Sequence, residues 1–304
     1  MNEWISIIRT IIEAGTPLLI GTLGQIAIER TGILNLGAEG IMIMGAVTGF
    51  AFARITGNPW IGLVAAILIG IFFALIHGII SISFNGNQTI SGLALTMFGI
   101  GLSGLIGRNY IGIPVKHIPR IPLFPLDKIP ILGQILFNTN PLVYLSFLLV
   151  LIYWFILYKT KIGIIVRAVG DSPETAESMG ISVIKVKYLG TIIGGALIGL
   201  SGAYLSLIYI PAWIEGMTAG RGWIIVSLTV FAMWDPIYAV FGSYLFGGVE
   251  VMQYILQPYG IPPAFLSMSP YIVTILVLCI ASRESIRKRL GAPKTLGKPY
   301  IREK

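Results

Sequence analysis

The residues that could carry chemistry in this chain are a few polar side chains set among long apolar stretches. Gln25 and Glu29 lie four residues apart and would share one face of a helix, and Asn35 and Glu39 follow after a glycine break. Charges and broken backbone are tolerated at membrane depth only where they face protein or a water-filled space. We therefore expect these four residues to line a substrate pathway. The alternative is that Glu29 and Arg30 only mark the end of a helix.

A second polar stretch, Asn87-Gln88-Thr89, lies between two apolar runs, and we assign it to the same pathway. Asn87 or Thr89 could instead only cap the helix that follows, because both side chains can accept hydrogen bonds from backbone N–H groups. A third break, at Asp235 and Pro236, is explained by capping alone, since an acid followed by proline begins a helix well.

These polar breaks interrupt a chain that its composition assigns to the membrane. Of the 304 residues, 55% are hydrophobic and 11% are charged, whereas soluble domains carry about 25% charged residues. A spanning helix needs roughly 20 mainly apolar residues. We predict an all-α fold, a polytopic transmembrane helical bundle of about nine spans, with a range of eight to ten. The predicted spans are 11–28, 41–53, 60–83, 90–106, 142–158, 186–208, 223–234, 237–256 and 264–281, of which 41–53 and 223–234 are short enough to be half-helices.

Basic residues predict the orientation of the bundle. They collect in the 159–187 connection and after Ala281, where eight of the 21 lysines and arginines lie. Because cytoplasmic loops are rich in lysine and arginine, we predict one transmembrane domain over 1–282, a cytoplasmic loop at 159–187 and a basic cytoplasmic tail at 283–304. Nine spans then place the N-terminus outside the cytoplasmic membrane. The proline-rich loop 108–141 is expected outside, ordered without being helical.

The predicted span 186–208 is unusually rich in glycine. Four of its glycines are spaced for close contact with neighbouring helices: Gly190, Gly194, Gly195 and Gly199. The stretches around Glu39 and Asp235 also share a plan, in which an inward span, a glycine or proline break with an acid, and an outward helix follow one another. This plan predicts two parallel structural repeats, as in several transporter folds.

The 159–187 loop contains a clear helix start. Asp171-Ser172-Pro173-Glu174 provides an N-cap at Ser172 or Asp171, a proline in the first turn and an acid near the positive end of the helix dipole. Gly180 suits the C-terminal end of that helix. A helix of about seven residues is not stable alone in water, so it must pack on its own bundle or on a partner protein.

The spacing of Glu174, Ala176 and Gly180 resembles the EAA loop of importer permeases of the ATP-binding-cassette (ABC) class, with Thr175 in place of an alanine. That loop holds the coupling helix, which docks in a groove of the ATPase. The similar segments follow in order along nearly the whole chain: ERTGILNLGAEGIMIMGA (29–46), NQTISGLAL (87–95), TKIGIIVRAVGDSPETAESMGI (160–181), Trp234-Asp235-Pro236 and PYIVTILVLCIASR…APKTLGKPY (270–300). The chain is similar to the permease family of the branched-chain amino acid and simple-sugar importers, and most of all to its nucleoside (guanosine-type) branch.

This resemblance implies both a complex and a division of labour within it. The chain would be one of two membrane subunits, paired with a longer related permease as a heterodimer, with two ATPase domains below and an extracytoplasmic solute-binding lipoprotein delivering a nucleoside. The coupling helix would involve Arg167, Asp171, Ser172, Glu174, Ala176 and Gly180. The chain would bind no cofactor and would not be an enzyme, because ATP and Mg²⁺ belong to the ATPase. The sequence itself contains no GxxxxGK[ST] motif.

Other functions remain open from the residues alone. A simple sugar is the alternative substrate. An ion-coupled secondary transporter could use Glu29, Glu39 and Glu250 as coupling carboxylates. An intramembrane enzyme is disfavoured, because no catalytic or metal-binding constellation occurs, and His77 and His117 are expected on opposite sides of the membrane. A nucleic-acid partner is not expected, since no soluble domain could present a basic surface to it.

Overall fold

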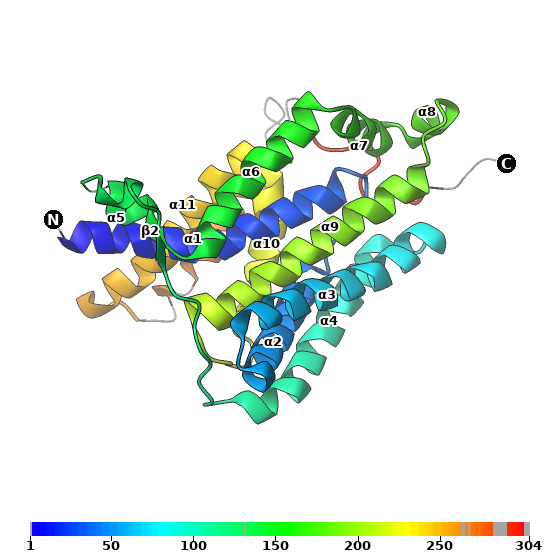
Figure 1. Cartoon of the computed structure of the whole chain (residues 1–304). Helices are drawn as coiled ribbons and strands as arrows, with labels where there is room; N and C mark the ends of the chain where they lie inside the picture. The colour runs from blue at the N-terminus through cyan, green and yellow to red at the C-terminus, as the bar shows by residue number, and fades with distance from the viewer. Residues whose placement is uncertain (1, 131, 263–264, 267, 282–290, 301–304) are drawn as a thin grey trace.

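The computed structural model describes residues 2–130, 132–262, 265–266, 268–281 and 291–300, and it is a bundle of long helices (Figure 1). The helices are α1 Asn2–Glu29, α2 Ala38–Thr56, α3 Pro59–Gly78, α4 Gln88–Gly107, α5 Leu132–Leu136, α6 Pro141–Lys159, α7 Lys161–Asp171, α8 Pro173–Ser178, α9 Val183–Tyr204, α10 Arg221–Phe231, α11 Pro236–Leu256 and α13 Ser269–Ala281. Short helical segments are η1 Ile79–Ser83, η2 Arg108–Tyr110, η3 Leu126–Lys128, η4 Leu205–Tyr209 and η5 Gln257–Tyr259. Two strands, β1 Ile121–Pro122 and β2 Asn138–Thr139, pair antiparallel.

Seven of the helices in the described residues are long and apolar enough to cross a membrane. The predicted span 41–53 becomes the 19-residue α2, because the helix already begins at Ala38 and continues to Thr56, so it is not a half-helix. The predicted span 223–234 stays short, as the 11-residue α10. Part of the last predicted span, 264–281, falls outside the described residues, and α13 covers 13 residues of it.

The centre of the bundle is α9, which packs against α1, α2 and α3 (Figure 1). A Cβ on Gly190 would lie 2.7 Å from the backbone oxygen of Ala27 in α1, and one on Gly199 would lie 2.9 Å from the Cα of Gly70 in α3. Gly194 and Gly195 face α1 and α3 in the same way. The glycines thus lie on two faces of α9. On one face the backbone of α1, and on the other the backbone of α3, approaches α9 closely enough to leave no room for a side chain.

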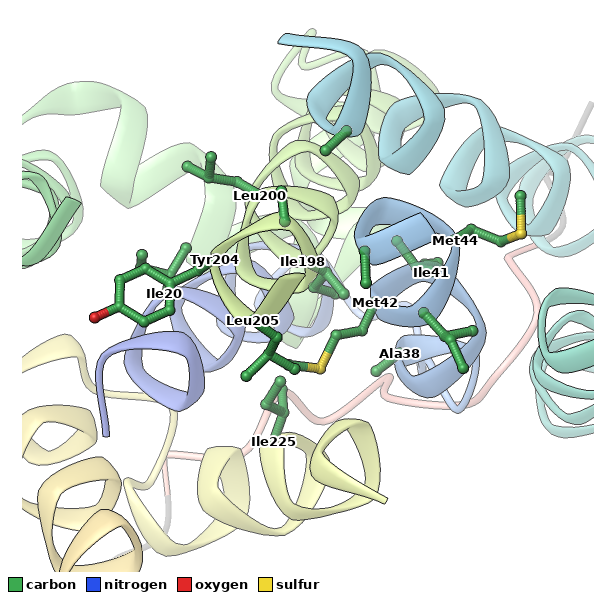
Figure 2. Packing of buried hydrophobic residues seen from close by; sticks show 14 of the residues in the cluster. Ile20, Ala38, Ile41, Met42, Met44, Ile198, Leu200, Tyr204, Leu205 and Ile225 are labelled. Atoms are coloured by element: carbon green, nitrogen blue, oxygen red, sulfur yellow. The ribbon is translucent and has the colours of Figure 1, made fainter. Parts of the chain in front are cut away.

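Apolar side chains fill the remaining space around α9. Met42 of α2, Leu205 of η4 and Ile225 of α10 point toward one another and are buried (Figure 2). The outer helices instead carry large exposed apolar residues, among them Phe72 in α3 and Met97 in α4. Soluble proteins rarely expose so continuous an apolar surface, so these outer faces suit lipid or another membrane subunit.

The segment 108–141 differs from its prediction, because it contains the short helix α5 and the β1–β2 pair. Its prolines limit helix length without preventing one turn between Pro130 and Pro141. The segment packs on the first turns of α1: Arg9 donates to the backbone oxygen of Gln134 at 2.7 Å, and Arg120 forms an ion pair with Glu13 at 2.8 Å. We call this end of the bundle the α5 end.

The opposite end, the α8 end, holds α7, α8 and the described C-terminal residues 291–300 (Figure 1). The start of α1 therefore lies at one end, and the 159–187 segment shares the other with the C-terminal residues. Six of the basic residues that predicted a cytoplasmic tail lie outside the described residues: Arg283, Arg287, Lys288, Arg289, Arg302 and Lys304.

Candidate functional site

The break between α1 and α2 is held by a buried network of polar side chains. Gln25 donates to Glu29 Oε1 and to the backbone oxygen of Asn35, both at 2.7 Å, and Asn35 Nδ2 donates back to Gln25 Oε1 at 2.9 Å. Asn35 Oδ1 also accepts from the N–H of Gly37 at 3.0 Å. These side chains are at most 2% exposed. We call Gln25, Glu29 and Asn35 the break cluster.

The break cluster is closed by the turn between α10 and α11. Trp234 Nε1 donates to Glu29 Oε2 at 2.6 Å. Arg30 Nε donates to the backbone oxygen of Trp234 at 3.0 Å. Both Met233 and Trp234 have positive φ values, 53° and 55°, which bulky residues rarely adopt. The hydrogen bonds to Glu29 and Arg30 hold Trp234 in this turn, so the breaks α1–α2 and α10–α11 form one unit.

Gln88 and His77 attach the same break to α3 and α4. Gln88 Oε1 accepts from the N–H of Leu34 at 2.7 Å, and His77 Nε2 lies 3.0 Å from the oxygen of Leu34. His77 Nδ1 lies 3.0 Å from Ser91 Oγ. His77 is therefore a buried structural link, and His117 lines a cavity with Glu13, at the α5 end.

Asn87 and Thr89 do not join the break cluster. Asn87 Oδ1 accepts from the N–H of Ile90 at 3.0 Å and so caps α4. Thr89 is exposed on the first turn of α4. Of the three predicted residues of this stretch, only Gln88 is brought to the break.

Glu39 lies where the N-termini of α2 and α10 meet. Its Oε1 accepts from Thr218 Oγ1 at 2.5 Å and from the N–H of Gly220 at 3.1 Å, and its Oε2 accepts from the N–H of Gly222 at 2.6 Å. Gly222 has no room for a side chain, because a Cβ there would lie 2.7 Å from Glu39 Oε2. A carboxylate is favourable at a helix N-terminus, so Glu39 stabilises α10 from a different helix.

A second charged site lies beside the N-terminus of α10. Arg221 and Glu250 form an ion pair, each side chain being 12% exposed, and Tyr209 donates to Glu250 Oε1 at 3.3 Å. The pair borders a cavity of about 360 Å³ that is also lined by Gln253 and Tyr271. The sequence showed Glu250 in an apolar run, but nothing marked Arg221 as its partner.

The short helix predicted after Asp171 is present as α8, Pro173–Ser178. Gly180 follows it with a φ of 81° and donates to the oxygen of Glu177 at 2.8 Å, as expected for a residue that ends a helix. Ser172 occupies the N-cap position, although its hydroxyl lies 2.7 Å from that of Thr175 and is not bonded to the backbone. Ala176 is buried against the bundle.

The outer face of this segment is open. Asp171 and Glu174 are exposed, and Met179 is 78% exposed. Arg167 places its guanidinium 5.3 Å from the ring centre of Tyr158. Arg167 belongs to α7, an 11-residue helix that was not predicted. The apolar spacing of its residues was a sufficient signal for it.

Comparison with known proteins decides the family. The family described as "Branched-chain amino acid transport system / permease component" matches residues 7–280. The chain belongs to this permease family. The permease is therefore a multi-pass membrane subunit of an ABC transporter complex. It is not an enzyme and has no cofactor of its own, because the ATPase is a separate subunit.

Three relatives cover nearly the full length of the permease. It is 37% identical to TsgC13 of Haloferax volcanii, named as a glucose ABC transporter permease, over 98% of each chain. It is 36% identical to the guanosine ABC transporter permease NupQ of Bacillus subtilis, over 98% of this chain and 97% of the other. It is 30% identical to the nucleoside ABC transporter permease NupC of Lactococcus lactis subsp. cremoris, with the same coverage.

The fold has a solved counterpart. An inward-facing ABC transporter described as of the metal-chelate type aligns with a TM-score of 0.51 at 16% identity, over 90% of this chain and 85% of the other. At this identity the similarity concerns the fold alone.

The family assignment also sets aside an ion-coupled carrier. Each carboxylate invoked for such a carrier is already bound, Glu29 by Trp234, Glu39 by the α10 N-terminus and Glu250 by Arg221.

Proposed function

We propose that the permease translocates nucleosides across the cytoplasmic membrane by alternating access, driven by the ATPase of its complex. The observation that carries this proposal is similarity over nearly the whole chain to NupQ and NupC, which are named for guanosine and nucleosides. A simple sugar is the second candidate, because TsgC13, named for glucose, is 37% identical. Nucleosides and sugars are both neutral and rich in hydroxyl groups, so one polar, uncharged pathway suits either class.

The interior of the bundle supports a neutral substrate. Glu29, Glu39 and Glu250 each accept hydrogen bonds from neighbouring helices. Arg221 neutralises Glu250, and neutral donors already occupy the oxygens of Glu29 and Glu39. We propose that the pathway runs along the break cluster, Gln88 and Glu39, which would come into contact with solute when the α1–α2 break moves. The permease should bind solute weakly, since affinity belongs to the binding protein.

We infer that α8 is the helix that docks on the ATPase. Its exposed acidic face and its open position at the α8 end suit contact with another protein. The α8 end would then be cytoplasmic and the α5 end outside, with one transmembrane domain over 1–282. This placement agrees with the basic residues of the 159–187 segment, because such residues favour the cytoplasmic side.

Three further partners complete the proposed assembly: a second, related permease subunit, a pair of ATPase domains and an extracytoplasmic solute-binding lipoprotein. The two breaks with acids, at α1–α2 and α10–α11, support two parallel repeats within this chain. The exposed apolar faces of α3, α4 and α6 offer surface both for lipid and for the second permease.

The substrate is tested with the cognate solute-binding protein. Its affinity for guanosine, ribose and glucose would be measured by titration calorimetry, followed by competition in uptake by the reconstituted complex. We expect tight binding of guanosine and no competition by sugars. Binding of glucose without binding of guanosine would replace the nucleoside by the second candidate. Uptake by the permease alone, with an ion gradient and no ATPase, would overturn both.

A further inference from the structure

The described C-terminal residues 291–300 form an irregular segment with a turn at 294–297, at the α8 end of the bundle, drawn in red near α7 in Figure 1. We call it the C-terminal strap. Ala292 and Leu296 of the strap pack on the apolar cluster that contains Leu23 of α1 and Trp234. The strap is thus part of the folded bundle, and it touches three places that are far apart in the sequence.

The first attachment joins the strap to the α1–α2 break and to the end of α7. Arg30 Nη1 donates to the oxygen of Gly291 at 2.8 Å. Thr295 donates to the oxygen of Gly170 through its hydroxyl at 2.6 Å and through its N–H at 3.1 Å. Gly32 has a φ of 86°, and a Cβ there would lie 2.6 Å from Thr295 Oγ1, so the break and the strap touch directly.

The second attachment reaches the start of α4. Gln88 Nε2 donates to the oxygen of Lys298 at 3.3 Å, while Gln88 Oε1 accepts from the N–H of Leu34. Gln88 therefore lies between the strap and the break. If the strap moves at Lys298, the hydrogen bonds of Gln88 would shift the start of α4 and Leu34 with it.

The third attachment lies beneath α8. The Tyr300 hydroxyl bonds Glu177 Oε2, and the Tyr300 ring packs with the buried residues Val169 and Ala176. The ammonium of Lys187, itself buried, lies 5.4 Å from the centre of the same ring. A six-residue helix cannot be stable alone, so the contacts of Tyr300 help to fix the position of α8 on the bundle.

We propose that the C-terminal strap transmits movement of α8 to the α1–α2 break, with Tyr300 as the positioning residue at its α8 end. This inference rests on the proposed role of α8 as the coupling helix. Along the chain, α8 leads back to the break only through α7, α6, α4, α3 and α2. In space, the end of α7 already touches the break, because a Cβ on Gly170 would clash with the backbone oxygen of Arg30. The strap provides a second connection, because its ten residues contact α8, the end of α7, α4 and the break. Chains of packed side chains and hydrogen bonds that have two arrangements can carry coupling between distant sites.

The test compares three variants in the full complex: Tyr300→Ala, Tyr300→Phe and Glu177→Gln. Lys294→Ala is the matched control, because this strap side chain is exposed. Size-exclusion chromatography reports assembly with the ATPase, and reconstituted vesicles report guanosine or glucose taken up per ATP hydrolysed. We expect Tyr300→Ala to assemble and to hydrolyse ATP at the basal rate while uptake per ATP falls at least about fivefold, the lower end of usual coupling strengths. Tyr300→Phe and Glu177→Gln should lower uptake per ATP by amounts similar to each other and smaller than in Tyr300→Ala.

A second measurement does not depend on the solute. Cys279 is first replaced by serine, and Thr89, which is exposed at the start of α4, is replaced by cysteine. The rate at which this cysteine reacts with a water-soluble maleimide measures the accessibility of the start of α4. We expect ATP with vanadate to change that rate in the otherwise native complex and not in Tyr300→Ala. An unchanged response in Tyr300→Ala, or unchanged uptake per ATP in all three variants, would overturn the strap proposal. Loss of assembly in Tyr300→Ala with normal coupling in Tyr300→Phe and Glu177→Gln would also overturn it. If the native complex takes up neither guanosine nor glucose, only the proposed substrate is contradicted. The labelling response does not depend on the solute and still tests the strap.

Discussion

Replacing Trp234 by phenylalanine should destabilise the permease mainly by removing one buried hydrogen bond. The Trp234 side chain is 4% exposed, and its Nε1 donates to Glu29 Oε2 at 2.6 Å. Phenylalanine retains an aromatic ring but leaves that carboxylate oxygen without its donor. A hydrogen bond to a charged group contributes about 1.5–3 kcal/mol in soluble proteins, and bonds between membrane helices reach at most about 1.7 kcal/mol. We therefore expect the loss of this bond to cost about 1–1.7 kcal/mol, at the upper end for a bond between membrane helices.

The chain provides a matched control in Trp213. This side chain is 2% exposed, and its Nε1 has no hydrogen-bond partner among the described residues. Trp213→Phe loses the same ring volume without losing a hydrogen bond. The difference in the free energy of unfolding between the two variants therefore measures the bond to Glu29. Unfolding by sodium dodecyl sulfate in mixed micelles, followed by far-ultraviolet circular dichroism, avoids tryptophan signals. Equal losses in both variants would refute the role assigned to the Trp234–Glu29 bond.

Three further substitutions test other parts of the structure. Gly199→Ala should lose about 1–3 kcal/mol in the same unfolding assay, because the added methyl group meets the backbone of α3; Gly101→Ala, with no described atom within 4 Å, should lose nothing. Gly180→Ala should cost about 1–2 kcal/mol of local strain, because of its positive φ, and should weaken co-purification with the ATPase without changing the fold measured by circular dichroism. Glu250→Ala should destabilise by about 3–5 kcal/mol by leaving the Arg221 charge buried, whereas replacing both residues by leucine should cost much less.

Local signals in the sequence were sufficient for most helices. Apolar length identified α3, α4, α6, α9 and α11. Asp235 caps α11 through bonds from the N–H groups of Ile237 and Tyr238, at 2.8 and 3.3 Å. Proline and glycine likewise marked the two ends of α8. These features depend on neighbours within one helical turn, and such neighbours are visible in a single sequence.

The partners of the buried polar residues could not be predicted in the same way. Glu39 stood out as an acid in apolar sequence, but its donors Thr218 and Gly222 lie about 180 positions later. Which elements meet is decided by packing along α9, and a single sequence does not show that packing. The C-terminal strap escaped prediction for a related reason. Its Gly-Ala-Pro-Lys-Thr-Leu-Gly-Lys-Pro-Tyr sequence has no helical or strand period, so only its contacts reveal that it is ordered.

The placement of Arg30 constrains how the permease can change conformation. Its guanidinium donates both to the oxygen of Trp234 and to that of Gly291, and it is 9% exposed. A displacement of the strap relative to α1 must break one of these bonds or move the α10–α11 turn with it. A buried guanidinium N–H that loses its acceptor is costly, so joint movement is favoured. The two breaks and the strap should therefore move together, and α9 should follow them where Gly190 packs on Ala27 and Thr31.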